Sequence, residues 1–220
     1  MRKIVGGVFQ SLDGVIQAPG GPSEDPTGGF VHGGWMFPVA DEQVGAVIGE
    51  FFSRPYDLLL GRGTYDIFAA YWPYVDGEAA AMSEAFTTAN KYVLTRGEQP
   101  LPWANSHRIH GMDDVAMLKS GDGPDLLIQG SSTIYPSLLA AGLLDRLMLY
   151  TFPIVLGCGK RLFGNGTPPG SFKLVDHQVS LGGTVITTYE PAGPVETGSF
   201  GATTSAREGE RQHKMKDGTW

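Results

Sequence analysis

Two short, continuously apolar runs restrict the fold of this chain more than any other feature. Residues 58–60 and 126–128 are each uninterrupted runs of leucine and isoleucine, and each is soon followed by a glycine-containing turn and a helical pattern. A strand with one face in water would alternate apolar and polar residues, so these runs indicate strands covered by helices on both faces. They predict an α/β fold around a mainly parallel sheet.

Strand and helix patterns alternate along the rest of the chain. Strands are predicted over residues 3–9, 57–60, 91–95, 125–129 and 146–152, and helices over 41–52, 64–70, 78–90, 113–119 and 132–141. Near the end, residues 171–180 and 184–189 flank Leu181-Gly182-Gly183, which is typical of an antiparallel hairpin. The predicted sheet is therefore mixed.

The organisation predicted from length and composition is one domain followed by a tail. A chain of 220 residues can bury one sizeable core, and residues 1–190 carry the regular patterns. Residues 191–220 are mostly polar, so we expect an extension that is either disordered or docked on a partner. Residues 17–35 are rich in glycine and proline and predict a long loop with few internal hydrogen bonds, which could act as a lid.

Charge and cysteine content exclude several classes of function. A net charge of −7 argues against binding to nucleic acid or an anionic membrane. The sequence shows neither a span of about 20 apolar residues nor a signal-peptide pattern, so we expect a cytoplasmic protein. Cys158 is the one cysteine, and His107 and His110 would point to opposite faces of a strand, so we expect no metal site.

The turn after the first apolar run carries residues suited to phosphate. Gly61, Arg62 and Thr64 lie at the start of a predicted helix. Backbone N–H groups at such a position attract anions, while Arg62 and Thr64 would add a charge and a hydroxyl donor. The turn is a candidate pyrophosphate site, although the same residues also suit an ordinary turn with Thr64 as N-cap.

Two other strand ends have similar chemistry. Gln129-Gly130-Ser131-Ser132 follows the second apolar run, where serine could bind phosphate or simply cap the helix. Thr95 and Arg96 end another strand and would suit a ribose 2′-phosphate, which favours NADPH over NADH unless Arg96 is only solvated. The first strand is not followed by Gly-x-Gly-x-x-Gly, so a Rossmann domain is disfavoured.

Taken in order, these motifs resemble a known family. They are Ser11-Leu12-Asp13-Gly14, Leu60-Gly61-Arg62-Gly63-Thr64-Tyr65, Tyr71-Trp72-Pro73, residues 91–96, Gln129-Gly130-Ser131-Ser132, residues 141–146 and residues 153–163. The chain is similar over about residues 2–190 to the dihydrofolate-reductase-like family, which includes the C-terminal reductase domain of the riboflavin-biosynthesis bifunctional enzyme. The colinear order makes the resemblance specific where each motif alone is not.

The resemblance implies a three-layer sandwich, with helices on both faces of the sheet and NADPH across the carboxyl ends of its strands. The implied cofactor contacts are Gly14 and Val15 for the nicotinamide, Gly61, Arg62 and Thr64 for the pyrophosphate, Thr95 and Arg96 for the 2′-phosphate, and Gln129, Gly130, Ser131, Ser132 and Ile134 beside the phosphates.

Two acids are candidates for catalysis. Asp41 resembles the carboxylate that holds the pterin in dihydrofolate reductases, although it also suits an N-cap or a first-turn acid that complements the helix dipole. Asp13 lies near the implied nicotinamide site, although Asp-Gly is also a common turn.

The resemblance thus implies an NADPH-dependent reductase acting on a small planar, heterocyclic substrate, of the pterin or aminopyrimidine type. The alternative is a nucleotide-binding module of the same fold without efficient turnover, acting as a sensor or partner-binding protein. The β-prone segments 143–152 and 174–189 further predict a homodimer through the late strands.

Overall fold

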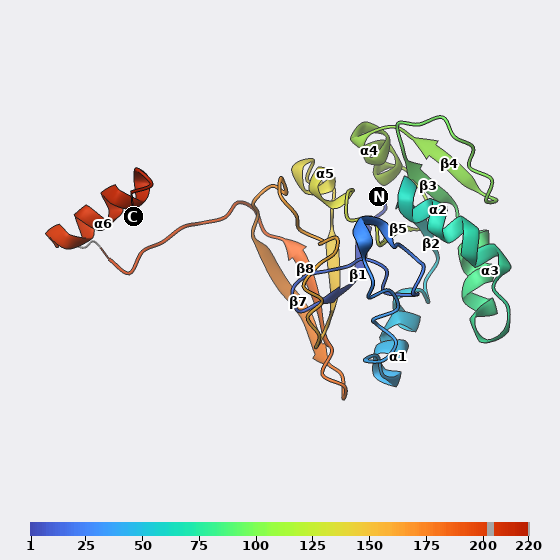
Figure 1. Ribbon diagram of the computed structural model, residues 1–220. Coiled ribbons are helices and arrows are strands. Elements are labelled where there is room, and N and C mark those ends of the chain that lie inside the picture. Colours follow the sequence, from blue (N-terminus) through green and yellow to red (C-terminus); the bar gives the residue numbers. More distant parts are fainter. Residues whose placement is uncertain (202–204, 220) are drawn as a thin grey trace.

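One eight-stranded sheet forms the centre of the computed structural model, which describes residues 1–201 and 205–219. The strand order is β4-β3-β2-β5-β1-β6-β8-β7 (Figure 1). The strands are β1 (Ile4–Ser11), β2 (Tyr56–Gly61), β3 (Lys91–Leu94), β4 (Ser106–Ile109), β5 (Asp125–Gln129), β6 (Arg146–Phe152), β7 (Phe172–Val179) and β8 (Val185–Pro191). Strands β1 to β6 run parallel, while β8 is antiparallel to both β6 and β7.

Helices cover both faces of the sheet. The helices are α1 (Glu42–Phe51), α2 (Arg62–Tyr71), α3 (Ala80–Thr88), α4 (Met112–Ser120), α5 (Tyr135–Ala140) and α6 (Ala206–Lys216), with short 3-10 turns at Thr27–Gly29, Trp72–Tyr74 and Gly77–Ala79. One core cluster joins the sheet to α4 and α5, and two others join the opposite face to α1, α2 and α3. The predicted three-layer α/β fold with its C-terminal hairpin is confirmed.

The apolar runs occupy the middle of this sandwich, as predicted. Every residue of β2 is buried, and Leu59 packs in the cluster under α4 and α5 while Leu58 and Leu60 pack in the opposite one. In β5, Leu126 and Ile128 face the first cluster and Leu127 the other. Burial on both faces explains why neither run contains a polar residue.

Two predicted helices begin later than the sequence pattern indicated. The helix expected over 132–141 starts at Tyr135, because residues 132–134 form a turn after Gly130 and Ser131, whose φ angles are 73° and 57°. The helix expected over 78–90 is divided into the 3-10 turn Gly77–Ala79 and α3.

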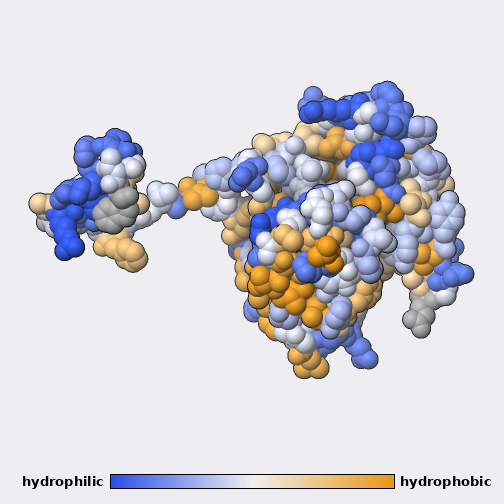
Figure 2. Space-filling model, in the orientation of Figure 1, coloured by the Kyte–Doolittle hydropathy of each residue, from blue (hydrophilic) through white to orange (hydrophobic). Residues whose placement is uncertain are grey.

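The polar extension contains a helix that the sequence reasoning did not anticipate. Helix α6 is N-capped by Ser205, whose hydroxyl accepts a hydrogen bond from the Glu208 N–H at 3.1 Å. Figure 1 shows α6 standing apart from the sheet, and Figure 2 shows that its surface is mainly hydrophilic. Residues 202–204 and 220 of this extension lie outside the described residues. None of the described helices is long and apolar enough to cross a membrane.

The edge at which the parallel strands begin is closed by a buried ion pair. Arg2 precedes β1 and contacts Asp57 at the start of β2, and their side chains are only 4% and 6% exposed. The Arg2 Nε also donates to the Pro124 carbonyl at 2.6 Å. Asp57 Oδ1 accepts from the backbone N–H and the side-chain amide of Asn90 at 3.1 and 3.0 Å. These contacts link the starts of β1, β2, β3 and β5 at one end of the sheet.

Candidate functional site

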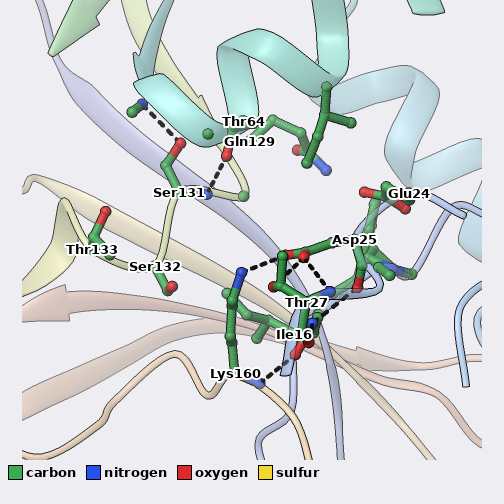
Figure 3. A pocket seen from close by; sticks show the side chains of 18 of the residues that line it. Ile16, Glu24, Asp25, Thr27, Thr64, Gln129, Ser131, Ser132, Thr133 and Lys160 are labelled. Atoms are coloured by element: carbon green, nitrogen blue, oxygen red, sulfur yellow. Dashed lines mark hydrogen bonds and ion pairs between the residues drawn. The ribbon is translucent and has the colours of Figure 1, made fainter. Parts of the chain in front are cut away.

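A cavity of about 500 Å³ opens at the other edge of the sheet, where β1, β2 and β5 end. Figure 3 shows its polar side chains, which come from residues 17–27, Thr64, residues 129–133 and Lys160. The turn-side wall consists of Gly61, Gly63, Thr64, Ile67, Phe68 and residues 129–133, and the facing wall of residues 16–19, 24–27 and Lys160 above Val8 and Phe9. In open α/β sheets, ligands bind outside the carboxyl ends of the strands, so this cavity is the candidate site.

Ser131 joins the two phosphate-type turns into one wall. Its hydroxyl accepts a hydrogen bond from the Gly61 N–H at 2.9 Å, and its own N–H donates to the Thr64 hydroxyl oxygen at 3.1 Å. The positive φ of Ser131 turns the residue toward β2, at the cost of leaving helical geometry. Two turns about 70 residues apart in sequence are thereby held in register.

The first turn of α2 adds a local positive field to this wall. Gly63 and Thr64 line the cavity, and the N–H groups of a helix's first turn have no partner within the helix. A Cβ added at Gly63 would meet no atom within 4 Å, so the backbone is open there. An anionic group could therefore approach the N-terminus of this ten-residue helix closely.

The facing wall is organised around Gln17, which is only 4% exposed. Its amide nitrogen donates to the carbonyls of Asp25 and Thr27, both at 2.9 Å, and its amide oxygen accepts from the Lys160 N–H at 3.0 Å. Its carbonyl accepts from the indole N–H of Trp35 at 2.8 Å. The prediction that residues 17–35 have few internal hydrogen bonds is therefore wrong. Because the buried Gln17 side chain donates hydrogen bonds to carbonyls of this loop, the loop is better described as a fixed wall than as a freely opening lid.

Two adjacent carboxylates in this wall have different surroundings. Asp25 accepts from the Lys160 ammonium at 2.6 Å and from the Thr27 hydroxyl at 2.5 Å. Burial alone would raise the pKa of Asp25, but these hydrogen bonds lower it overall. No cation of the described residues pairs with Glu24, and desolvation raises the pKa of this carboxyl. The sequence reasoning missed both residues, because a Glu-Asp pair in a glycine-rich segment reads as an ordinary solvated loop.

The structure brings six predicted cofactor residues to the cavity and places the other six elsewhere. Gly61, Thr64, Gln129, Gly130, Ser131 and Ser132 line it. Val15 is fully buried below, Gly14 forms the turn before it, and Ile134 packs under the turn wall with 1% exposure. The residues after Val15, from Ile16 onward, form the cavity wall instead.

Arg62, Thr95 and Arg96 lie beside the cavity without lining it. The Arg62 guanidinium donates to the Asp66 carboxylate at 2.8 Å and to the Gln99 carbonyl at 3.1 Å. The bond to Asp66 raises the pKa of Arg62. Thr95 and Arg96 follow β3, the strand next to β2. Thr95 is buried, with its hydroxyl oxygen accepting from the Gly97 N–H, whereas Arg96 is exposed.

Both predicted catalytic acids are held by contacts outside the cavity. Asp41 caps α1 through the Val44 N–H at 3.0 Å and accepts from the Gly182 N–H of the β7–β8 turn at 2.6 Å. The first of these bonds contributes most to lowering its pKa. Asp13 accepts from the Ser11 hydroxyl at 2.6 Å and from the N–H groups of Leu156 and Gly157. The Ser11 bond is the largest cause that lowers the pKa of Asp13 to about 2.

These contacts favour structural roles for Asp13 and Asp41, because a carboxyl with a low pKa is a poor proton donor at neutral pH. Within residues 1–201 and 205–219, no cluster of three or more His, Cys, Asp or Glu side chains could hold a metal ion.

A parallel sheet with an antiparallel C-terminal hairpin and a cavity at the strand ends defines a dihydrofolate-reductase-like α/β protein. The family model of the RibD C-terminal domain matches residues 2–186. The chain therefore belongs to the RibD C-terminal domain family. A sequence relative is the uncharacterized protein YyaP of Bacillus subtilis strain 168, 24% identical over 86% of this chain and 94% of the relative.

Three solved structures share the fold. A putative riboflavin biosynthesis protein from Shewanella sp. PV-4 superposes with a TM-score of 0.60 at 24% identity, over 86% of this chain and 99% of the other. A pyrimidine reductase-like protein from Corynebacterium diphtheriae gives 0.56 at 14% identity, over 87% and 92%. Dihydrofolate reductase from Enterococcus faecalis, complexed with NADP(H) and RAB-propyl, gives 0.53 at 16% identity, over 86% and 96%. Fold and family together indicate an oxidoreductase of the RibD and dihydrofolate reductase type.

Proposed function

We propose that this protein is an NADPH-dependent reductase that transfers a hydride to a C=N or C=O bond of a small planar substrate, of the pterin or aminopyrimidine type. The observation that carries the proposal is the cavity at the ends of β1, β2 and β5, with two phosphate-compatible turns joined by Ser131 on one wall. The family, and the fold shared with a dihydrofolate reductase complexed with NADP(H), support this choice of cofactor.

The residues of the turn wall fit the phosphates of such a dinucleotide. The Thr64 oxygen accepts from the Ser131 N–H, which leaves the Thr64 hydroxyl hydrogen able to donate to a phosphate oxygen. The Ser132 side chain also lines the cavity, and Gly63 leaves the helix start open. NADPH would supply the hydride. Ile16 and Ala18, rather than the underlying Val15, would lie against its nicotinamide.

The choice between the two nicotinamide cofactors tests the proposal directly. We expect NADPH to bind at least ~10-fold more tightly than NADH, because a single charge-assisted contact to the 2′-phosphate from Arg96 supplies about 1.4 kcal/mol. Titration of nicotinamide fluorescence should show this ratio and its loss in Arg96→Gln. The matched control is Arg54→Gln, an exposed arginine before β2 at the opposite edge of the sheet. Equal affinities of the unaltered protein for NADPH and NADH would contradict the assignment of Arg96.

Turnover is tested by a screen for NADPH oxidation, run over pterins, aminopyrimidine ribitol compounds and small carbonyls. We expect at least one member to be reduced. Binding of NADPH without oxidation in the presence of any of them would instead support the nucleotide-binding module. We place the reductase in the cytoplasm, where a free and exposed Cys158 stays reduced.

We also propose a homodimer formed through the face of β7 and β8 that faces away from α1. Leu174 and Val179 pair with Tyr189 and Val185 on this face, and Leu174, Val179 and Val185 are 45%, 62% and 38% exposed. In Figure 2, hydrophobic surface gathers on the half of the body that carries these strands and the segment after β1. An isologous pairing would bury this face of β7 and β8. Light scattering at micromolar concentration should give twice the monomer mass. The Val179→Asp variant should give a mass closer to that of the monomer.

A further inference from the structure

We propose that Glu24 is the proton donor of the reductase, an inference that rests on the proposed function. Glu24 lies in the wall that faces the two phosphate-type turns, on the same side as Asp25 and Thr27 (Figure 3). Its side chain is part of the lining of the cavity, where a substrate could meet it directly.

The position of the Glu24 carboxyl is fixed by the loop itself. One oxygen, Oε2, accepts a hydrogen bond from the Gly20 N–H at 2.6 Å. That bond and a backbone hydrogen bond from Gly21 hold the side chain in place at the cavity. Gln17 and Trp35 fix the rest of the loop, so the carboxyl is presented by a supported segment rather than by a mobile one.

The surroundings of Glu24 favour its neutral form, and those of its neighbour do not. Among the described residues that line the cavity, Glu24, Asp25 and Lys160 are the ionisable ones. The Lys160 ammonium is bound to Asp25, so Asp25 takes the available positive charge and stays ionised. Burial raises the pKa of Glu24 and outweighs the backbone hydrogen bonds from Gly20 and Gly21, which lower it, while the negative charge of Asp25 adds a smaller rise. Adjacent carboxyls whose pKa values diverge in this way are the usual arrangement for an acid and its charged partner.

The alternative acids near the strand ends do not meet these requirements. Asp13 is held by Ser11 and by two backbone N–H groups, with its pKa lowered to about 2. Asp41 is held between α1 and the β7–β8 turn. Neither lines the cavity.

In the proposed reaction, the substrate takes up a hydride and a proton. The hydride adds to the carbon of the substrate's C=N or C=O bond, and the π electron pair moves to the nitrogen or oxygen. That atom takes the proton from the Glu24 carboxyl. The dinucleotide leaves as NADP⁺, and the Glu24 carboxylate regains a proton from water. Glu24 must therefore be protonated at the start of each turnover.

The first test measures the proton on Glu24 without any ligand. Carbon-13 NMR of protein labelled at the glutamate carboxyl carbons, followed over pH, should show one carboxyl that titrates above the ordinary glutamate range. This signal should be absent from Glu24→Gln, which keeps an oxygen for the Gly20 N–H. It should persist in Glu42→Gln, a matched change at an exposed glutamate in the first turn of α1. An ordinary titration of Glu24 would overturn the proposal and leave the proposed reductase function intact.

The second test uses the substrate found by the NADPH-oxidation screen. Loss of a general acid typically costs about 10²-fold or more in rate, so kcat should fall by at least that factor in Glu24→Gln, with NADPH affinity unchanged within about twofold. For the unaltered protein, kcat should decline as pH rises through the pKa of Glu24, and Glu24→Gln should lack this decline. Unchanged kcat and pH dependence in Glu24→Gln would overturn the proposal.

The two proposals can fail separately. If the unaltered protein binds NADPH but reduces no member of the screen, the reductase function fails and the catalytic role of Glu24 fails with it. If turnover is found and Glu24→Gln loses NADPH binding to the same extent as kcat, Glu24 is a cofactor-binding residue and not the proton donor.

Discussion

The two edges of the parallel sheet use similar polar side chains for opposite purposes. At the edge where the strands begin, Arg2 and Asp57 are almost fully buried and bond to each other, to the Pro124 carbonyl and to Asn90. At the edge where the strands end, Glu24 and Ser132 line an open cavity. Saturated polar groups at the first edge hold the strands together. Polar groups with remaining hydrogen-bonding capacity at the second edge are available to a ligand.

Ser131 and Asp13 are intermediate cases at the second edge. They belong to the cavity end of the sheet, yet their polar atoms bond to other parts of the protein. They position the walls rather than the ligand. We therefore expect a substitution at the first edge to change stability without changing cofactor affinity. A substitution at Ser131 should change both.

The largest effect is expected at the buried ion pair. Asp57→Ala leaves the Arg2 guanidinium buried without its charge partner, which should lower the free energy of unfolding by about 3–5 kcal/mol. NADPH affinity of the folded protein should not change. Urea unfolding and nicotinamide fluorescence measure the two quantities. The control is Glu98→Ala, since Glu98 is 83% exposed and 3.8 Å from Arg108, and such a surface pair contributes at most about 1 kcal/mol. A parallel loss of affinity in Asp57→Ala would break the comparison.

A smaller effect on stability, coupled to affinity, is expected at Ser131. Ser131→Ala removes the acceptor of the buried Gly61 N–H, and a buried donor without a partner costs about 1–3 kcal/mol. Because the same bond holds the two turns in register, NADPH should also bind more weakly. Ser137→Ala, at an exposed position in α5, is the matched control and should change neither quantity. Loss of stability with full affinity would show that the register of the turns does not matter for the cofactor.

The smallest effect is the pH dependence due to Asp13. The folded protein holds the pKa of Asp13 at about 2, below the ordinary 3.8, so the ionised carboxylate stabilises the folded state. This stabilisation is fully present above pH about 4 and is lost as pH falls toward 2. Asp13→Asn should therefore be less stable than the unaltered protein at pH 6, and the difference should shrink between pH 4 and 2. A difference in urea midpoint that stays constant over this range would mean that the charge of Asp13 contributes nothing.

The sequence by itself determined the layers of the fold and one wall of the cavity. Residues 58–60 and 126–128 are apolar on successive positions, and such a run has few outcomes other than a strand buried on both faces. Gly61, Thr64 and residues 129–132 could be assigned to the candidate site because a turn directly after a buried parallel strand must lie at the carboxyl edge of the sheet. Both inferences depend only on local pattern and on position in the chain.

Only the tertiary structure decided which polar groups remain available for chemistry. Asp41 accepts a hydrogen bond from Gly182, which is 141 residues away in the sequence, and Asp13 accepts one from Gly157, which is 144 residues away. Gln17, by binding the loop carbonyls, turns an apparently unstructured segment into a wall that carries Glu24. The local sequence around each acid is equally compatible with a cap, a turn or a catalytic group. The choice among them depends on which distant N–H group or cation reaches the carboxylate when the chain closes, and local periodicity contains no information about that.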